Sequence, residues 1–509
     1  MAVKRHPRGS RKALLVGASV LGVLAAALAP APLAAAADGE DLTARQRLSW
    51  SACDFDPTLE CTTVQVPLDY AHPRGPHLGI AVSRLKSAGG HRRGVLLSFN
   101  GGPGGDGGLG RRTPQRLAAG PLHGAYDLVG FDPRGTGASS PLLCKVTQPT
   151  VAFDSRPTDA SLPGLYADAR ATDQACAQAG GELRRTVNSA TVARDMDAIR
   201  AALGERKLNV LAYGDSTYTT AVYGTLFPHR LDRSVLDSSR NPDVDWHGQY
   251  KSQAYALRAN VDQWAAWTAD RDGHFSLGDS SEGVLASVEQ VVTALNTAPV
   301  GYLNRTAFDD AVGRLATDRT KWAQLGDLVG ALRDRPQAPE TVRLANAVLS
   351  PWSSPQGDTR PGTVEATTCE NDWPTDLASY AADVREFRVK YPYGLGALRA
   401  QPWVCAFRSF TPSERPPYIR NAGYPKGLVV HAEGNPVLQY AGGQAMARRL
   451  GDRLLTVADD GGSDVYLVRG NTCVDQKVTR YLLTGALPAA SDSTCAGAPR
   501  PAIPADDES

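Results

Sequence analysis

The chain has 509 residues, of which 54 are basic and 53 acidic, so its net charge is only +1. This balance gives no electrostatic footprint for nucleic acid or for an anionic membrane, and we expect a small-molecule or peptide-like ligand instead. A chain of this length is too long for one compact core, which predicts a main domain that carries a substantial insertion.

The amino terminus has the layout of a secretory signal peptide. Basic residues from Lys4 to Lys12 precede an apolar stretch over residues 13–28, and alanines fill residues 34–37. The apolar stretch is too short to cross a bilayer, so we expect cleavage rather than membrane anchoring. We therefore predict a secreted protein whose mature chain begins near Ala37 or Asp38.

Eight cysteines follow this segment, and an even number in an exported chain indicates disulfides rather than metal ligands. Pairing of nearest neighbours would join Cys53 to Cys61, Cys144 to Cys176, Cys369 to Cys405 and Cys473 to Cys495, although the sequence leaves other pairings open. The chain contains neither a CxxC nor an HExxH motif, so we predict no metal site and no cofactor.

Short apolar segments that end in glycine-rich turns predict the central strands of a parallel sheet. They cover residues 94–100, 126–132 and 208–213, and the pattern resumes at residues 427–432 and 453–458, before a helix expected at residues 474–483. Helical periodicity dominates the region between, as in residues 252–271, 281–295 and 306–332. The predicted fold is an α/β fold, with a mostly parallel sheet and an inserted helical lid.

These patterns divide the chain into consecutive parts. They are the signal peptide (1–37), the first part of the α/β core (38–240), the lid (241–416), the second part of the core (417–498) and a tail expected to be disordered (499–509).

Several motifs occur in a characteristic order along the chain. Residues 66–70 read VPLDY, residues 100–105 read NGGPGG and residues 126–137 read YDLVGFDPRGTG, and NPV, AMARRL and GNTCV follow at 435–437, 445–450 and 470–474. Over nearly the whole mature chain they resemble the secreted tripeptidyl aminopeptidase branch of the α/β-hydrolases, which is related to proline iminopeptidases. The resemblance implies the α/β-hydrolase fold and a serine nucleophile on a GxSxG turn, with an acid and a histidine following in that order.

The serine position of this motif falls on Gly214 when residues 207–228 are aligned with the family without a gap. The same register places Asp215 directly after the nucleophile position and Ser216 where the family has a glycine. A second register, shifted by two residues, makes Ser216 the nucleophile but puts the bulky Tyr218 where close packing requires a small residue. We favour the first register, in which the nucleophile is lost.

The acid and histidine positions are substituted as well. The family's acid matches Asn435, whose amide cannot act as the anion that orients an imidazolium. The family's histidine falls on Ser463, or on Gly462 after a slip of one residue. None of the nine histidines follows Asn435, so no ordinary triad can form. His431 and His247 remain candidates for a base, with a structural role as the alternative for His431.

Other residues could still bind or polarise a substrate. The resemblance implies that Gly101, Gly102 and Gly105 offer backbone N–H groups to an oxyanion, together with the N–H of Asp215, although such a loop also suits a tight turn. Glu370 and Asp372 resemble a lid motif that holds the substrate's amino group in aminopeptidases, and His247 could point toward the site. Loop carboxylates expected nearby are Glu433, Asp459, Asp460 and Asp464.

These features support three hypotheses about function. We favour an enzyme that transforms a neutral small molecule or peptide-like compound by positioning and by acid-base or electrostatic catalysis, without an acyl-enzyme. The first alternative is a serine exopeptidase or esterase that uses Ser216. The second is a catalytically inactive pseudo-hydrolase that binds a peptide or a metabolite.

Overall fold

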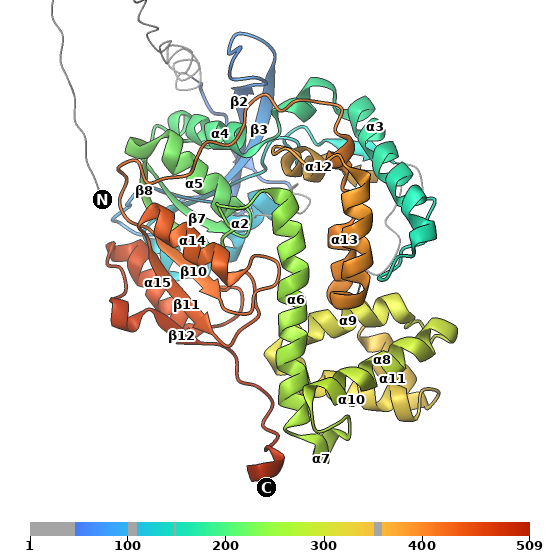
Figure 1. Cartoon of the computed structure of the whole chain (residues 1–509). Coiled ribbons are helices and arrows are strands. Elements are labelled where there is room, and N and C mark those ends of the chain that lie inside the picture. The colour runs from blue at the N-terminus through green and yellow to red at the C-terminus, as the bar shows by residue number, and fades with distance from the viewer. Residues whose placement is uncertain (1–45, 100–108, 147–148, 351–358, 509) are drawn as a thin grey trace, which may run out of the picture. The chain divides into compact units, whose positions relative to one another are not determined.

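The structure, a computed structural model, describes residues 46–99, 109–146, 149–350 and 359–508 (Figure 1). Within these residues the main sheet has ten strands in the order β1-β2-β3-β5-β4-β7-β8-β10-β11-β12. Pairing is antiparallel from β1 to β5 in this order and parallel from β5 to β12. This mostly parallel sheet confirms the predicted α/β-hydrolase fold.

The central strands β4 and β7 are buried along their whole length, which explains the continuous apolar runs in the sequence. The strands are β1 Ser51–Ala52, β2 Glu60–Pro67, β3 His77–Leu85, β4 Val95–Phe99, β5 Asp127–Phe131, β7 Leu208–Tyr213, β8 Leu231–Asp237, β10 Leu428–Ala432, β11 Arg453–Ala458 and β12 Thr494–Ala496. A separate pair is formed by β6 Leu143–Lys145 and β9 Thr359–Pro361.

Helices cover both faces of the sheet (Figure 1). One face packs against α4 (Ser189–Ala202), α5 (Ser216–Leu226) and α14 (Tyr440–Leu450), whose apolar side chains share a core with the strands. The other face packs against α2 (Leu109–Leu117) and α15 (Thr472–Thr484). The carboxyl ends of β7, β8, β10 and β11 therefore meet at one edge of the sheet, which is where open α/β sheets carry their sites.

The lid has a hydrophobic core of its own, around Trp264 and Trp322. Its long helix α6 extends from the sheet to the lid helices (Figure 1), and residues 306–332 form two helices because Asp318 caps a turn between them. The helices of this region are α6 Trp246–Ala269, α7 Asp272–Phe275, α8 Ser281–Thr297, α9 Arg305–Thr317, α10 Trp322–Asp334, α11 Pro339–Ala347, α12 Gly362–Thr368 and α13 Leu377–Lys390, followed by the 3-10 helices η6 Tyr393–Ala400 and η7 Val404–Phe407. Helix α3 (Leu162–Thr186) precedes α4.

All four nearest-neighbour disulfides are confirmed. The structure joins Cys53 to Cys61, Cys144 to Cys176, Cys369 to Cys405 and Cys473 to Cys495. The third of these ties the end of α12 to η7, next to the segment that carries Glu370.

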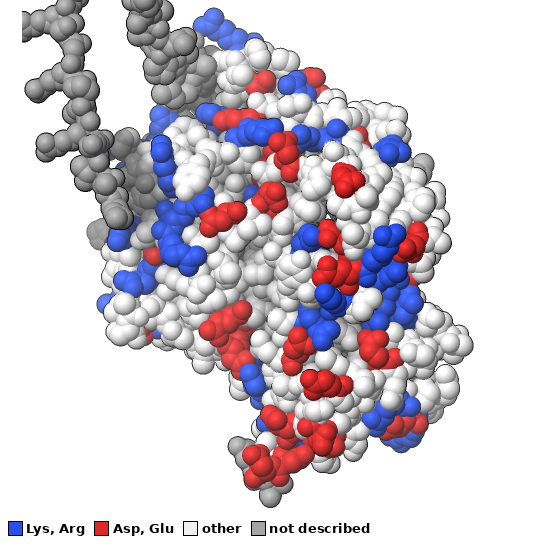
Figure 2. All heavy atoms as spheres, in the orientation of Figure 1, with Lys and Arg blue, Asp and Glu red and all other residues white. Residues whose placement is uncertain are grey.

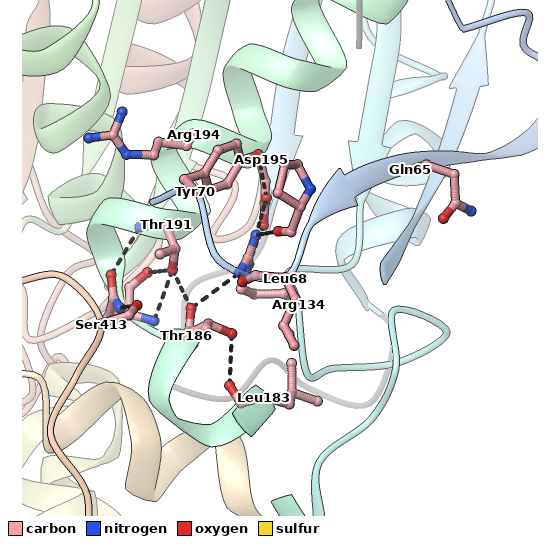
Figure 3. A network of polar contacts seen from close by, with 12 residues as sticks. Gln65, Leu68, Tyr70, Arg134, Leu183, Thr186, Thr191, Arg194, Asp195 and Ser413 are labelled. Atoms are coloured by element: carbon pink, nitrogen blue, oxygen red, sulfur yellow. Dashed lines mark hydrogen bonds and ion pairs between the residues drawn. The ribbon is translucent and has the colours of Figure 1, made fainter. Parts of the chain in front are cut away.

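A buried ion pair anchors the loop after β5 (Figure 3). Arg134 donates from Nε and Nη2 to both carboxylate oxygens of Asp195 on α4 (2.7 and 2.6 Å). It also donates to the carbonyls of Leu68 (2.8 Å) and Pro67 (3.2 Å), and the hydroxyl of Tyr70 donates to Asp195 (2.9 Å). The arginine of the DPRGTG motif is thus a structural anchor with every donor group in use.

The tail from residue 499, expected to be disordered, is instead bound to the lid. The N–H of Asp506 donates to the carbonyl of Asp270 (2.9 Å), and the carboxylate of Asp506 accepts from the N–H of Gly273 (2.9 Å). Arg271 donates to the carbonyl of Ile503 (2.7 Å). The composition of the tail could not reveal these contacts, because they come from a distant lid segment.

Acidic and basic side chains are interspersed on the face shown in Figure 2, in keeping with the near-zero net charge. No helix among the residues that the structure describes is both long enough and apolar enough to span a membrane. The expected signal peptide, residues 1–37, lies outside the described residues.

Candidate functional site

Gly214 lies in the turn between β7 and α5, where an α/β-hydrolase presents its nucleophile. Its φ of 58° is left-handed backbone, which glycine adopts without steric cost. Its N–H donates to the carbonyl of Asp237 (2.9 Å), and its carbonyl accepts from the N–H of Thr217 (3.1 Å). The strand, sharp turn and helix of a nucleophile elbow are therefore present, but the residue at the turn has no side chain.

Ser216, the alternative nucleophile, begins α5 and is only 2% exposed. Its Oγ accepts from the N–H of Tyr213 (2.9 Å) and lies within hydrogen-bonding distance of the carbonyls of Tyr213 (2.8 Å) and Phe99 (3.1 Å). The hydroxyl thus joins the ends of β7 and β4. This placement favours a structural role, since a nucleophile has to reach the substrate.

The substituted acid and histidine positions contact each other. Asn435 follows β10 and is buried, and Ser463 lies in the loop after β11. The Ser463 hydroxyl donates to Oδ1 of Asn435 (2.9 Å), which also accepts from the N–H groups of Val437 (3.0 Å) and Leu438 (3.1 Å). The hydrogen bond thus joins two neutral side chains, at the positions that the resemblance predicts for the acid and the histidine.

The same contact favours Ser463 over Gly462 as the histidine position. A Cβ added to Gly462 would lie 2.1 Å from Nε of Arg469, but this arginine is exposed and its flexible side chain can move away, so the choice rests on the contact with Asn435. His431, the other candidate base, is buried on β10 with its ring nitrogens near the carbonyls of Ala432 (3.1 Å) and Ser239 (3.4 Å). Burial lowers the pKa of His431, as for a neutral structural histidine.

Asp215 is the polar side chain that directly follows Gly214 in the turn. Its side chain is partly buried, and its Oδ1 is fully buried without a hydrogen-bond partner in the described part of the chain. Burial raises the pKa of Asp215 to about 7; Arg240 opposes the shift, whereas Asp464 and Glu370 add to it. A carboxyl group that titrates near neutral pH can both take up and release a proton.

Arg240, which the sequence analysis missed, contacts the helix that follows the turn at Gly214. It lies just beyond β8, with its guanidinium 3.5 Å from the centre of the Tyr218 ring and 4.2 Å from that of Trp246. Its terminal nitrogens are 3.5 Å from Oε1 of Glu370. A charged residue just after a buried strand was the available signal, and the stacking shows how the bulky Tyr218 is accommodated.

The two acidic lid residues are placed differently. Glu370 is buried and accepts hydrogen bonds from the N–H and hydroxyl of Ser189 (2.8 and 3.0 Å) and from Nε1 of Trp246 (3.1 Å). Asp372 is exposed and pairs with Arg408 (3.1 Å) and Arg415 (2.9 Å). Of the two, only Glu370 is linked to the elbow, through Arg240.

His247 belongs to an aromatic group at the base of the lid. Its ring packs against Trp373 (5.3 Å between centres) and Tyr380 (5.6 Å), and burial lowers its pKa. Its Nε2 is buried without a partner among the residues that are described. The predicted oxyanion glycines Gly101, Gly102 and Gly105 lie outside the described residues.

The loop carboxylates have separate surroundings. Asp459 pairs with Arg319 (3.3 Å) and Arg500 (2.8 Å), whereas Asp460 accepts from the N–H of Gly462 (2.6 Å). Glu433 accepts from the N–H of Asp459 (3.0 Å). Of these four loop carboxylates, Asp464 is the one whose charge contributes to the raised pKa of Asp215.

Comparisons with known proteins agree with this architecture. The family described as TAP-like protein matches residues 391–495. A tripeptidyl aminopeptidase from Streptomyces coelicolor is 33% identical over 494 residues, which cover 90% of this chain and 88% of that protein. The chain belongs to the tripeptidyl aminopeptidase family.

Membership in this family makes the protein a relative of α/β-hydrolase-type enzymes. The serine protease Hip1 of Mycobacterium tuberculosis is 28% identical over 477 residues, 87% of this chain and 90% of that protein. Among solved structures, proline iminopeptidase from Mycobacterium smegmatis matches with 12% identity and a TM-score of 0.35, covering 83% of this chain and 100% of that one. The assignment rests on the sequence relatives.

Proposed function

We propose that this member of the tripeptidyl aminopeptidase family transforms a small-molecule or peptide-like compound by acid-base catalysis at Asp215, without an acyl-enzyme. The observation that carries the proposal is the elbow itself. Gly214 holds the nucleophile position in left-handed backbone and offers no atom that could attack a carbonyl carbon.

The surroundings of the elbow support proton transfer. The carboxyl group of Asp215 has a pKa of about 7, so it can take up or release a proton near neutral pH. Its buried Oδ1 has no hydrogen-bond partner in the described chain that would compete with a ligand. Asn435 and Ser463 replace a charged pair with a neutral hydrogen bond, which removes the usual base. Elimination, cyclisation and isomerisation need a positioned acid or base and do not need a covalent intermediate.

Mass spectrometry of a ligand panel tests the proposal. We expect a product with unchanged mass or with the loss of a small molecule, formed by the wild type and lost in Asp215→Asn. The wild-type rate should change with an inflection near pH 7, following the titration of Asp215. A ligand released chemically unchanged would instead support a binding protein, and two products whose masses add up to that of the ligand plus one water would support hydrolysis.

Hydrolysis is the second candidate, because the relatives are named tripeptidyl aminopeptidase and serine protease. Ser216 would then have to leave its contacts with Tyr213 and Phe99 to reach the substrate. Turnover of aminoacyl substrates that stops in Ser216→Ala, but continues in Asp215→Asn, would establish this candidate and exclude the first.

A further inference from the structure

Arg399 of η6 is a lid arginine with no hydrogen-bond or ion-pair partner among the described residues. Its Nε is buried, and no hydrogen bond or ion pair joins its guanidinium to any residue in the described segments. The nearest ring is that of Tyr250, whose centre lies 5.8 Å from the guanidinium carbon. Two residues further on, Nε2 of Gln401 is also buried and has no hydrogen-bond partner in the part of the chain that is described.

The guanidinium of Arg399 lies within electrostatic reach of Asp310 but does not pair with it. Burial raises the pKa of Asp310, while Arg314 and Arg399 oppose the shift. Burial also lowers the pKa of Arg399, but a guanidinium stays protonated in proteins. Arg399 is half-buried, and no carboxylate of the described residues forms an ion pair with it, so its N–H groups can bind an anion from a ligand.

The backbone holds Arg399 in a fixed place. The second and third residues of η6, Gly394 (φ 61°) and Leu395 (φ 62°), have left-handed backbone. A Cβ at Gly394 would lie 2.7 Å from the Leu257 side chain, and one at Gly313 would lie 2.3 Å from the Gly394 nitrogen, so α6 and α9 both press on this turn. The arginine is thus presented from a rigid support, as a binding residue requires.

Tyr250 of α6 links Arg399 to the elbow. Its pKa is raised, mainly by burial, and the charges that act on it include Arg399 and Arg240, which lower it, and Asp215 and Glu365, which raise it. Its phenol therefore stays a neutral hydrogen-bond donor within electrostatic reach of both Arg399 and Asp215. The Tyr250 ring also lies 6.1 Å from the ring of Trp246, on which Arg240 stacks at 4.2 Å, so a row of side chains connects Arg399 to the surroundings of the elbow.

We propose that Arg399 and Tyr250 form a carboxylate-binding subsite, which holds an acidic group of the ligand while its reacting part lies at Asp215. The planar guanidinium donates a paired set of N–H groups that suits a carboxylate, and the phenol adds a third donor. This inference rests on the proposed peptide-like ligand, and it changes the expectation of a neutral compound into one with an anionic end.

Calorimetry with trialanine and trialanine amide as probes tests the subsite. We expect the wild type to bind the free acid at least about tenfold more tightly than the amide, because only the acid forms a charge-assisted pair. Arg399→Gln should abolish this preference and Tyr250→Phe should reduce it, whereas Arg343→Gln, an exposed lid arginine on α11, should leave it unchanged. Equal binding of acid and amide by the wild type would overturn the subsite alone.

A measurement without ligand separates the inference from the proposed function. If Arg399 is an unpartnered cation kept for a ligand, Arg399→Met should raise the melting temperature of the free protein, by about 1–3 °C. A lower melting temperature for Arg399→Met would show a structural role and overturn the subsite. Failure of both probes to bind any variant would overturn the peptide-like ligand class on which the inference rests.

Discussion

Two arginines, Arg134 of the core and Arg399 of the lid, show how differently this fold treats buried charge. Arg134 uses all of its donor groups on Asp195 and on backbone carbonyls (Figure 3), whereas Arg399 has no partner in the described chain. A satisfied network of this kind holds a structure together. An arginine without such a network, as Arg399 is among the described residues, is where we propose that a ligand binds.

The largest effect should follow from breaking the satisfied network. Asp195→Asn leaves Arg134 buried without an anion, and we expect unfolding in denaturant to show a loss of about 3–5 kcal/mol. Asp372→Asn is the matched control, because Asp372 pairs with Arg408 and Arg415 at the surface and should cost less than about 1 kcal/mol. Similar losses of unfolding free energy in the two variants would show that the buried network around Arg134 stabilises the fold no more than a surface ion pair does.

A restoration experiment sharpens the account of the elbow. Gly214→Ser, Asn435→Asp and Ser463→His together should give hydrolysis of aminoacyl esters that is about 10²–10³-fold above the parent, since Asn435 and Ser463 already contact each other and Gly214 lies at the turn between β7 and α5. The control is Asn435→Asp with Ser463→His alone, which lacks a nucleophile. A triple variant that is folded but no faster than this control would count against the placement of Gly214.

The smallest effect concerns the stability of the elbow and its pH dependence. The folded-state pKa of Asp215 is raised to about 7 from its usual 3.8, so the folded state binds more protons than the unfolded state between these values. Stability should therefore fall as the pH rises from about 4 to 7. Asp215→Asn removes this loss and should be more stable than the wild type at pH 8.

We expect the gain to be about 1 kcal/mol, less than the full shift implies, because the side chain is partly exposed to solvent. Unfolding curves of the two proteins at pH 4.5 and pH 8 measure this gain. At pH 4.5 the wild type and Asp215→Asn should have similar free energies of unfolding. An equal difference at both pH values would show that Asp215 does not titrate in this range.

Much of the scaffold could be predicted from local sequence. The buried strands and the disulfide pairing follow from short motifs and spacing, and the register that assigns the nucleophile position to Gly214 stays a prediction. The contact between Asn435 and Ser463 agrees with that register, since both positions follow strands whose carboxyl ends lie at the same edge.

The remaining features depend on side-chain direction and on distant contacts. Sequence could not show that Ser216 turns back toward Phe99, that Glu370 is buried against Ser189, or that the tail binds α7. Arg240 and Arg399 escaped notice because a lone arginine in a sequence is ordinarily a surface residue. Only the structure shows which arginine is paired and which is not.

The central claim, that this elbow forms no acyl-enzyme, is tested most directly by intact mass spectrometry after treatment with a fluorophosphonate, with an active tripeptidyl aminopeptidase as the positive control. The account predicts no covalent adduct, because Gly214 has no nucleophile and the hydroxyl of Ser216 is bonded inside the sheet. An adduct that maps to Ser216 and disappears in Ser216→Ala would contradict it.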